Sequence, residues 1–146
     1  MLNMSKMLAA ASMVAVLGLT GCATTEQDAP PIKTVYHIND SATAMAAMNN
    51  IKNQLAASPK DQIIVVTHGK GIDFLLQDAT DKDGNPYQPR IDDLMAKKVD
   101  FRVCNNTLKS RNLDPSAVVK GAKIVPSGVA EVAMVQAREG YTYIKP

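Results

Sequence analysis

The sequence predicts an α/β domain, a three-layer α/β/α sandwich with a mainly parallel five-stranded sheet. β-rich runs alternate with helical patterns along the chain, and this order favours parallel strands joined by helices that cover both faces of the sheet. Residues 62–67, Gln-Ile-Ile-Val-Val-Thr, form a continuous apolar run of strand length. Such a run is typical of a strand that is buried on both faces of a parallel sheet.

The strands are predicted from composition and from the residues that bound them. The first is a short β-rich run, and the third alternates apolar and polar residues before it ends at Cys104. Alternation with period two indicates a strand with one face in the core. The five predicted strands are residues 33–38, 62–67, 99–103, 122–125 and 141–144.

Helical spacing of apolar residues separates these strands. Residues 41–57 follow an N-cap cluster at residues 39–41 and place apolar side chains on one face, with Met45 and Met48 in the helix core. The other predicted helices are residues 72–77, 91–99, 105–113, 115–120 and 129–138. Residues 78–89 are polar and are predicted to be a loop.

Residues 1–21 predict a lipoprotein signal peptide. A cation at Lys6 precedes an uncharged apolar run, residues 7–19, which is too short to span a bilayer. The run ends in Leu19-Thr20-Gly21-Cys22, which resembles a bacterial lipobox, in which the cysteine thiol accepts lipid. The alternative is an ordinary secretory signal that is cut nearby and leaves Cys22 as a free thiol.

The residues after Cys22 predict where the protein is held. Ala23, rather than aspartate, follows the cysteine, and in lipoproteins that resemble this one this favours the outer membrane. We therefore expect a lipid-anchored protein of the bacterial envelope that faces the periplasm. Residues 22–31 are predicted to be the lipidated N-terminus and a flexible tether, and residues 32–146 the folded domain.

Charge and composition exclude several classes of partner. The precursor has 16 Lys and Arg against 14 Asp and Glu, and loss of Lys6 with the signal brings the mature chain close to neutral. A near-neutral chain argues against a nucleic-acid partner held by charge. The chain has no Trp, so no stacking platform for bases is visible.

Cys104 is the most informative single residue. The chain has two cysteines, and lipid on Cys22 leaves Cys104 unpaired in an oxidising compartment. It lies where a predicted strand meets a predicted helix, and a helix N-terminus lowers the pKa of a thiol. Arg102, Lys109 and Arg111 could add local positive charge. The alternative is a small buried side chain without chemistry.

The ends of the predicted strands carry the candidate site. Ligands of parallel sheets bind beyond the carboxyl ends of the strands, and both histidines and Cys104 fall at such ends. The predicted catalytic residues are Cys104, His37 and His68, and the predicted substrate-binding residues are Asn105, Asn106, Gly69 and Ser127. Alternatively, the histidines are structural, and residues 68–71 are a strand-to-helix turn rather than an anion cradle.

No metal site and no cofactor are predicted. The two histidines are not at a recognisable zinc spacing. Residues 81–85, Asp-Lys-Asp-Gly-Asn, are similar to a calcium loop, but placing Gly84 at position six puts Ala79 at position one, so the pattern fails. A surface turn is the better interpretation, and residues 78–89 could form a lid over the site.

Residues 99–108, Val-Asp-Phe-Arg-Val-Cys-Asn-Asn-Thr-Leu, resemble the cysteine segment of the DsrE/DsrF-like family, which includes the sulfur-relay proteins of the TusBCD type. Residues 35–39, 63–69 and 124–131 fit the same pattern, and the resemblance covers residues 32–146. It implies a five-stranded parallel α/β/α domain that commonly oligomerises. It also implies that Cys104 carries sulfur as a persulfide and passes it to a partner thiol.

Together these patterns predict a sulfur carrier or sulfurtransferase at the envelope. Its partners would be a thiol or persulfide donor or acceptor protein, or a small sulfur compound, and the membrane through the lipid; we expect a homo-oligomer. The known relays work in the cytoplasm, whereas this chain is predicted to be exported, so donor and acceptor stay open. The alternative is a non-enzymatic binding or oligomeric assembly module with a structural or redox-sensing Cys104.

Overall fold

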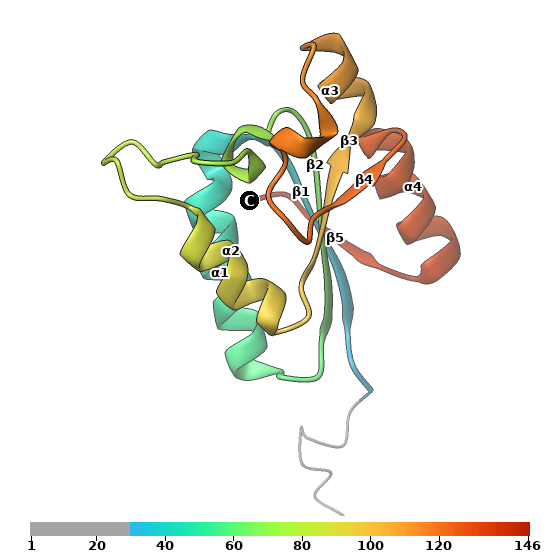
Figure 1. The fold of residues 1–146 in the computed structure, drawn as a ribbon. Coiled ribbons are helices and arrows are strands. Elements are labelled where there is room, and N and C mark those ends of the chain that lie inside the picture. The colour runs from blue at the N-terminus through green and yellow to red at the C-terminus, as the bar shows by residue number, and fades with distance from the viewer. Residues whose placement is uncertain (1–29) are drawn as a thin grey trace, which may run out of the picture.

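A computed structural model describes residues 30–146, which form a five-stranded parallel sheet flanked by helices (Figure 1). The predicted signal peptide and Cys22 lie outside the described residues. The strands run in the order β4-β3-β2-β1-β5, and all four neighbouring pairs are parallel. They are β1 Lys33–Asp40, β2 Gln62–Lys70, β3 Asp100–Cys104, β4 Lys123–Val125 and β5 Thr142–Ile144. The predicted fold class is confirmed.

Four α-helices connect the strands. They are α1 Ala44–Ala57, α2 Gln88–Ala96, α3 Asn105–Ser110 and α4 Gly128–Glu139. Three short 3₁₀ segments are Ser41–Thr43, Asp73–Leu75 and Pro115–Ala117. Among residues 30–146, no helix has both the length and the apolar character needed to cross a membrane.

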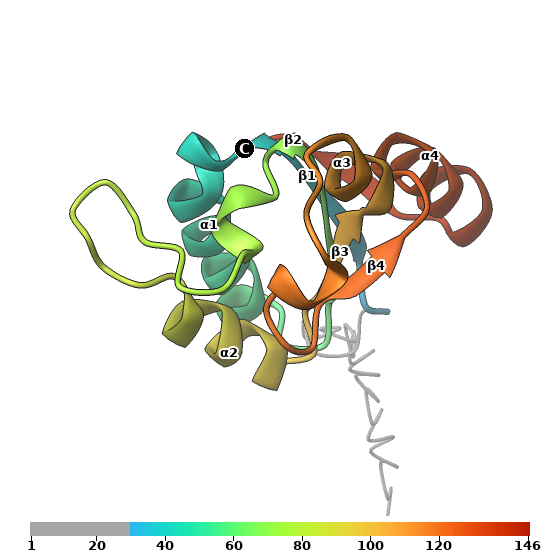
Figure 2. The same cartoon turned by 45° about the horizontal axis from the view of Figure 1, so that its top comes forward.

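The helices form two layers around the sheet. Helices α1 and α2 cover one face, and α4 covers the other (Figures 1 and 2). The larger core lies under α1 and α2 and includes the buried rings of Phe74 and Phe101. On the opposite face, Val132 and Val135 of α4 pack on the sheet. Helix α3 follows directly from β3, at the carboxyl end of that strand.

The alternation of side chains along the strands decides which residues meet on the α4 face. Val35, Ile64 and Val66 belong to the α4 cluster, and successive strand residues point to opposite faces. His37 and His68 therefore share the α4 face with Val35, Ile64 and Val66. Because Thr67 pairs with Val103, His68 and Cys104 are the next residues on two adjacent strands.

Several predicted helix boundaries are wrong. The predicted helices 72–77 and 115–120 are only the 3₁₀ segments Asp73–Leu75 and Pro115–Ala117. An antiparallel bridge between Leu76 and Val118 takes the backbone groups that longer helices would need. The helix predicted over residues 105–113 ends at Ser110, and Asn112 then has a φ of 52°.

Helix α2 begins at Gln88, three residues before the predicted start at Ile91. Pro89 lies in its first turn, where a proline is tolerated because the missing N–H would have no partner within the helix. The sequence interpretation had left this proline in the loop. Asp40 of the predicted N-cap cluster accepts a hydrogen bond from the N–H of Ala42 at 2.9 Å, but it caps the 3₁₀ segment Ser41–Thr43, and α1 begins only after it.

Strand β2 does not end at Thr67, and residues 68–71 are not a simple strand-to-helix turn. The strand continues to Lys70 through an irregularity: Ile38 pairs with Thr67, but Asp40 pairs with Lys70. The extra residue on β2 makes a bulge, and Gly69 within it has a φ of 56°. Bulges bend a strand and release a backbone group from the ladder, often beside a functional site.

Gly71 lets β1 and β2 approach closely, and this gives a test of the fold. A Cβ added at Gly71 would lie 2.1 Å from the carbonyl oxygen of Ile38, so the backbone would have to move. We expect Gly71→Ala to lower the free energy of unfolding by about 3 kcal/mol, the range for overpacking. Gly84→Ala is the control: at φ 82° with open space around it, it should cost about 1 kcal/mol. Urea unfolding measures both, and equal losses would contradict the close approach.

Candidate functional site

The Cys104 sulfur lies where two helices begin. Cys104 is the last residue of β3 and the N-cap of α3, and only 4 % of its surface is exposed. Hydrogen-bond donation from the backbones of Gly128, Thr107 and Asn106 and from the Thr107 side chain acts on its sulfur, although Cys104 makes no close side-chain capping bond to α3. Gly128 is the first residue of α4. The sulfur is thus buried, but its surroundings are polar and consist of donors.

These donors outweigh the effect of burial on the thiol. Burial alone acts to raise the pKa of Cys104, and the hydrogen bonds from Gly128, Thr107 and Asn106 act to lower it. Together the hydrogen bonds bring the pKa of Cys104 below that of an ordinary thiol. The thiolate, not the thiol, is the nucleophile, so this environment favours reactivity. The physical cause is that N–H and O–H groups donate hydrogen bonds to the thiolate and stabilise it relative to the thiol.

The Thr107 hydroxyl is oriented by the bulge in β2. The Gly69 N–H, which the bulge leaves outside the ladder, donates to Thr107 Oγ1 at 3.0 Å. A hydroxyl that accepts this bond still has its own proton to donate, and that proton goes to the Cys104 sulfur. Thr107 is itself buried. Gly69 therefore acts on the thiol through Thr107.

Glycine is required where α4 meets the sheet. A Cβ added at Gly128 would lie 3.1 Å from the carbonyl oxygen of Thr67, 3.1 Å from the Cβ of His68 and 3.2 Å from the Cβ of Cys104. These distances are tighter than ordinary van der Waals contact, and the positions of all three atoms, a carbonyl oxygen and two Cβ atoms, are fixed by the backbone. The absence of a side chain lets the Gly128 N–H reach the sulfur.

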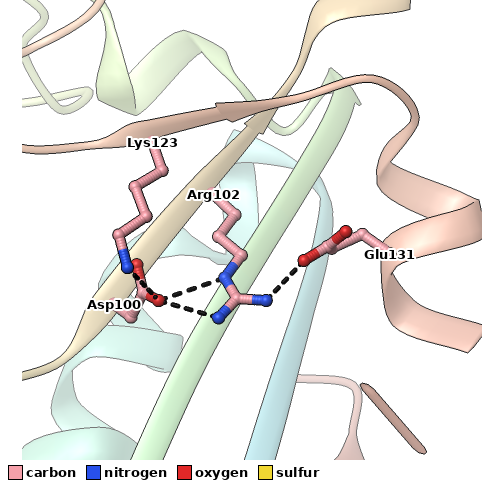
Figure 3. A network of polar contacts seen from close by, with 4 residues as sticks. All are labelled: Asp100, Arg102, Lys123 and Glu131. Carbon is pink, nitrogen blue, oxygen red and sulfur yellow. Dashed lines mark hydrogen bonds and ion pairs between the residues drawn. The ribbon is translucent and has the colours of Figure 1, made fainter. Parts of the chain in front are cut away.

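A polar network holds the first turn of α4 over β3 (Figure 3). Arg102 Nη2 lies 2.8 Å from Asp100 Oδ2, and Arg102 Nη1 bonds Glu131 of α4. Lys123 Nζ of β4 lies 2.8 Å from the same Asp100 oxygen. Arg102 and Glu131 are largely buried, with 15 % and 14 % of their side chains exposed. The network ties β3, β4 and α4 together two residues before Cys104.

The predicted role of cations at the thiol needs correction. Arg102 is held by two carboxylates, and Arg111 forms an ion pair with Asp73. The groups that lower the pKa of Cys104 are hydrogen-bond donors from Gly128, Thr107 and Asn106, not these side chains. Arg102 instead helps to position α4.

The two histidines contact each other. His37 Nε2 lies 2.7 Å from His68 Nε2, and His37 Nδ1 lies 2.8 Å from the hydroxyl of Tyr143 on β5. The imidazole centroids are 4.8 Å apart. Burial, then the charges of His68 and Lys145, lowers the pKa of His37 below that of an ordinary histidine. Both effects disfavour the protonated form of His37.

The structure brings most of the predicted site residues together. Cys104, Asn105 and Asn106 open α3, and the Asn106 backbone, not its exposed side chain, contacts the sulfur. The Ser127 hydroxyl caps α4 by accepting a bond from the Ala130 N–H at 3.5 Å. That these residues bind a substrate stays a prediction.

Three residues of the site were missed by sequence reasoning: Thr107, Gly128 and Tyr143. Thr107 had a signal, because the third residue after a helix N-cap offers its groups to the cap. Gly128 and Tyr143 had none, since they reach Cys104 and His37 only through the order of the strands.

The described residues also bear on the loop and on metals. Asp81 Oδ1 accepts hydrogen bonds from the N–H groups of Asp83 and Asn85, both at 2.9 Å, as expected for the predicted surface turn.

Within residues 30–146, no three His, Cys, Asp or Glu side chains are grouped so that they could hold a metal ion. No described contact tests the predicted lid.

The fold and the site define a class: a parallel α/β/α domain that presents a hydrogen-bonded cysteine at the carboxyl edge of its sheet. The chain belongs to the DsrE/DsrF-like family, whose sequence profile matches residues 23–146. This is a family associated with sulfur relay, and the predicted resemblance is confirmed. No curated protein sequence matches the chain.

The solved structures that share the fold include two proteins from different organisms. A protein of unknown function, MTH1491 from Methanobacterium thermoautotrophicum, is 27 % identical with a TM-score of 0.71, and the match covers 79 % of this chain and 99 % of that one. The ychN protein from E. coli is 13 % identical with a TM-score of 0.65, at the same coverage of 79 % and 99 %. The second likeness supports the fold alone.

The Thr107 hydroxyl provides a direct test of the site. Thr107→Val removes one hydrogen bond to a charged sulfur, a contribution of about 1.5 kcal/mol, which corresponds to about one pKa unit. We expect the thiol pKa, followed by thiolate absorbance against pH, to rise by about that amount. Thr107→Ser keeps the hydroxyl and is the control. If Val and Ser variants titrate alike, the hydroxyl does not act on the sulfur.

Proposed function

We propose that this protein is an envelope lipoprotein that carries sulfur as a persulfide on Cys104 and transfers it to a second thiol. The observation that supports this most is the set of donors around the Cys104 sulfur: three backbone N–H groups and the Thr107 hydroxyl. Such a set stabilises a sulfur anion without a metal. Membership of a family associated with sulfur relay points to the same chemistry.

The proposed reaction consists of two displacements. The Cys104 thiolate attacks the outer sulfur of a persulfide donor, R–S–SH; the new S–S bond forms as the old one breaks, and R–S⁻ leaves. A second thiolate, R′–S⁻, then attacks the outer sulfur of Cys104–S–SH, which gives R′–S–SH and restores the Cys104 thiolate. Each step exchanges one S–S bond for another, so no external oxidant or reductant is needed.

Burial of the thiol restricts the donor. With 4 % of Cys104 exposed, a bulky reagent or a flat protein surface cannot approach the sulfur directly. A slender group, such as an inorganic polysulfide or a persulfide on a flexible chain, meets less steric hindrance. We therefore favour a small sulfur compound, or a cysteine on a mobile segment of a partner, as the donor or acceptor.

The location of this chemistry is proposed from the N-terminal pattern. A lipid on Cys22 would hold the domain at the periplasmic face of the outer membrane by a short tether, residues 22–31. Each buried methylene contributes about 0.8 kcal/mol, so several acyl chains anchor a protein stably. Any sulfur donor or acceptor would then be an envelope component.

A second candidate function is a non-enzymatic binding or assembly module. The burial of Cys104 favours it, and so does the exposure of apolar side chains near the start of α4 and on the edge strand β4. Val129 is 61 % exposed and Ile124 is 39 % exposed. In this alternative, Cys104 is a structural or redox-sensing residue, and Cys104→Ser leaves assembly unchanged.

Sulfur loading tests the proposed function. We expect intact-mass spectra of the protein treated with glutathione persulfide to show one added sulfur atom, and none for Cys104→Ser. Thr107→Val should load more slowly than the wild type at any pH below its own thiol pKa, because a smaller fraction of Cys104 is thiolate there, and should approach the wild-type rate at alkaline pH. No added sulfur, together with resistance of the folded thiol to alkylation, would exclude the carrier function.

Membrane fractionation tests the anchor. We expect Cys22→Ser to lose the acyl mass and to leave the detergent-soluble membrane fraction, because its thiol is the only proposed site of lipid attachment. Cys104→Ser is the matched control and should stay with the membrane. Equal distribution of both variants would contradict lipidation at Cys22.

A further inference from the structure

Four side chains form a row across adjacent strands on the α4 face of the sheet. Tyr143 of β5, His37 of β1, His68 of β2 and Cys104 of β3 follow the order of the strands. The first three are joined by hydrogen bonds of 2.8 Å and 2.7 Å. Tyr143 is 42 % exposed, whereas Cys104 is 4 % exposed. The row therefore leads from solvent to the buried thiol.

The bond between the histidines holds a single proton. Two Nε2 atoms at 2.7 Å require that one imidazole donates and the other accepts. In one arrangement, Tyr143 donates to His37 Nδ1, His37 donates to His68 Nε2, and His68 Nδ1 carries a proton. In the other, His68 Nε2 donates to His37 Nε2, His37 Nδ1 donates to the Tyr143 oxygen, and His68 Nδ1 is an acceptor. Moving these protons switches His68 between acid and base.

His68 is the member of the chain that lies beside the thiol. The position of a Cβ on Gly128 is 3.1 Å from His68 Cβ and 3.2 Å from Cys104 Cβ, so both side chains start at the opening of α4. They also directly follow Thr67 and Val103, which are paired on the two adjacent strands. A sulfur compound bound at Cys104 would therefore be near His68.

The charged groups around the row either disfavour protonation of His37 or are paired with each other. Lys145, which follows β5, faces His37 and disfavours its protonation, and His68 does the same from β2. Glu131 of α4 and Arg102 of β3 bond each other. The Cys104 sulfur is held by N–H groups and by the Thr107 hydroxyl.

We propose that Tyr143, His37 and His68 form a proton relay for sulfur transfer at Cys104, with His68 as the general acid and base. His37 and Tyr143 are positioning residues that act through His68. The inference rests on the proposed persulfide function and adds the route by which its protons travel.

Proton balance defines what the relay does. In the loading step, the leaving R–S⁻ takes the proton of His68 Nδ1 and departs as R–SH. The His37 proton moves to His68 Nε2, the Tyr143 proton moves to His37 Nδ1, and water supplies a proton to Tyr143. In the unloading step, His68 Nδ1 takes the proton of the attacking R′–SH, the shifts reverse, and Tyr143 returns one proton to water.

The relay matters only when the leaving group is basic. An alkyl thiolate, with an ordinary pKa of about 8.5, leaves more readily when it is protonated. Methyl methanethiosulfonate is the contrasting probe: the Cys104 thiolate takes its CH₃S group and releases methanesulfinate, which needs no proton. The two reagents separate proton delivery from thiolate reactivity.

The experiment compares both reagents on the full chain. The rate of sulfur loading from glutathione persulfide is divided by the rate of methylthiolation. We expect His68→Asn to lower this ratio about a hundredfold, the low end of general acid catalysis. Tyr143→Phe should lower it several-fold, whereas the matched control Tyr141→Phe should not change it. An unchanged ratio in His68→Asn would overturn the relay.

Failure of the relay can be told from failure of the function. If wild-type Cys104 takes no sulfur from glutathione persulfide but is methylthiolated, the persulfide function is wrong. If loading occurs and the ratio is insensitive to His68→Asn, the function stands and the relay is wrong. Nitrogen NMR of the imidazoles is a readout that a structural role would not move. Tyr143→Phe should shift the balance between the Nδ1-protonated and Nε2-protonated tautomers of His68, and no shift would contradict the coupling.

Discussion

The close approach of α4 to the ends of β2 and β3 is the constraint on which the site depends. It is possible because Gly128 has no side chain between Thr67, His68 and Cys104. Through it, a backbone N–H from the last helix reaches a sulfur on the third strand. The first turn of α3 supplies the remaining N–H groups, so two helix N-termini meet at one atom. Their partial positive charges act in the same direction on a sulfur anion.

Other parts of the structure support that approach. The bond between Arg102 and Glu131 fixes the first turn of α4 over β3, and Asp100 holds the arginine from the other side. The bulge at Gly69 turns one N–H of β2 towards Thr107 and thereby orients the hydroxyl that faces the sulfur. A charged pair, a bulge and a glycine thus act together, although β2, β3 and α4, which carry them, are separate in sequence. The thiol can be buried and still favour its thiolate form, because these donors replace the hydrogen bonds that water would give to an exposed thiolate.

The histidine row adds a connection between this buried sulfur and solvent. The edge strand β5 contributes Tyr143, so the last strand of the chain completes a chain of hydrogen bonds that starts beside Cys104. In a site with so little exposed surface, protons need such a path, because water has little access to the sulfur. Burial and the neighbouring His68 and Lys145 also lower the pKa of His37, which favours a bond to His68 that holds one shared proton.

The sequence by itself determined the α/β class, the approximate positions of the five strands, and the place of Cys104 between a strand and a helix. These features are local, because periodicity, apolar runs and caps depend on residues that are close together in sequence. The sequence also indicated that His37 and His68 lie near the carboxyl ends of two strands. It failed at the short 3₁₀ segments and the bulge, where long-range bridges override local preference. Only the tertiary structure decided that Gly128 meets Cys104 and that Tyr143 meets His37. The reason is strand order: β5 pairs with β1 and brings Tyr143 to His37, 106 residues away in sequence, and no local pattern encodes that pairing.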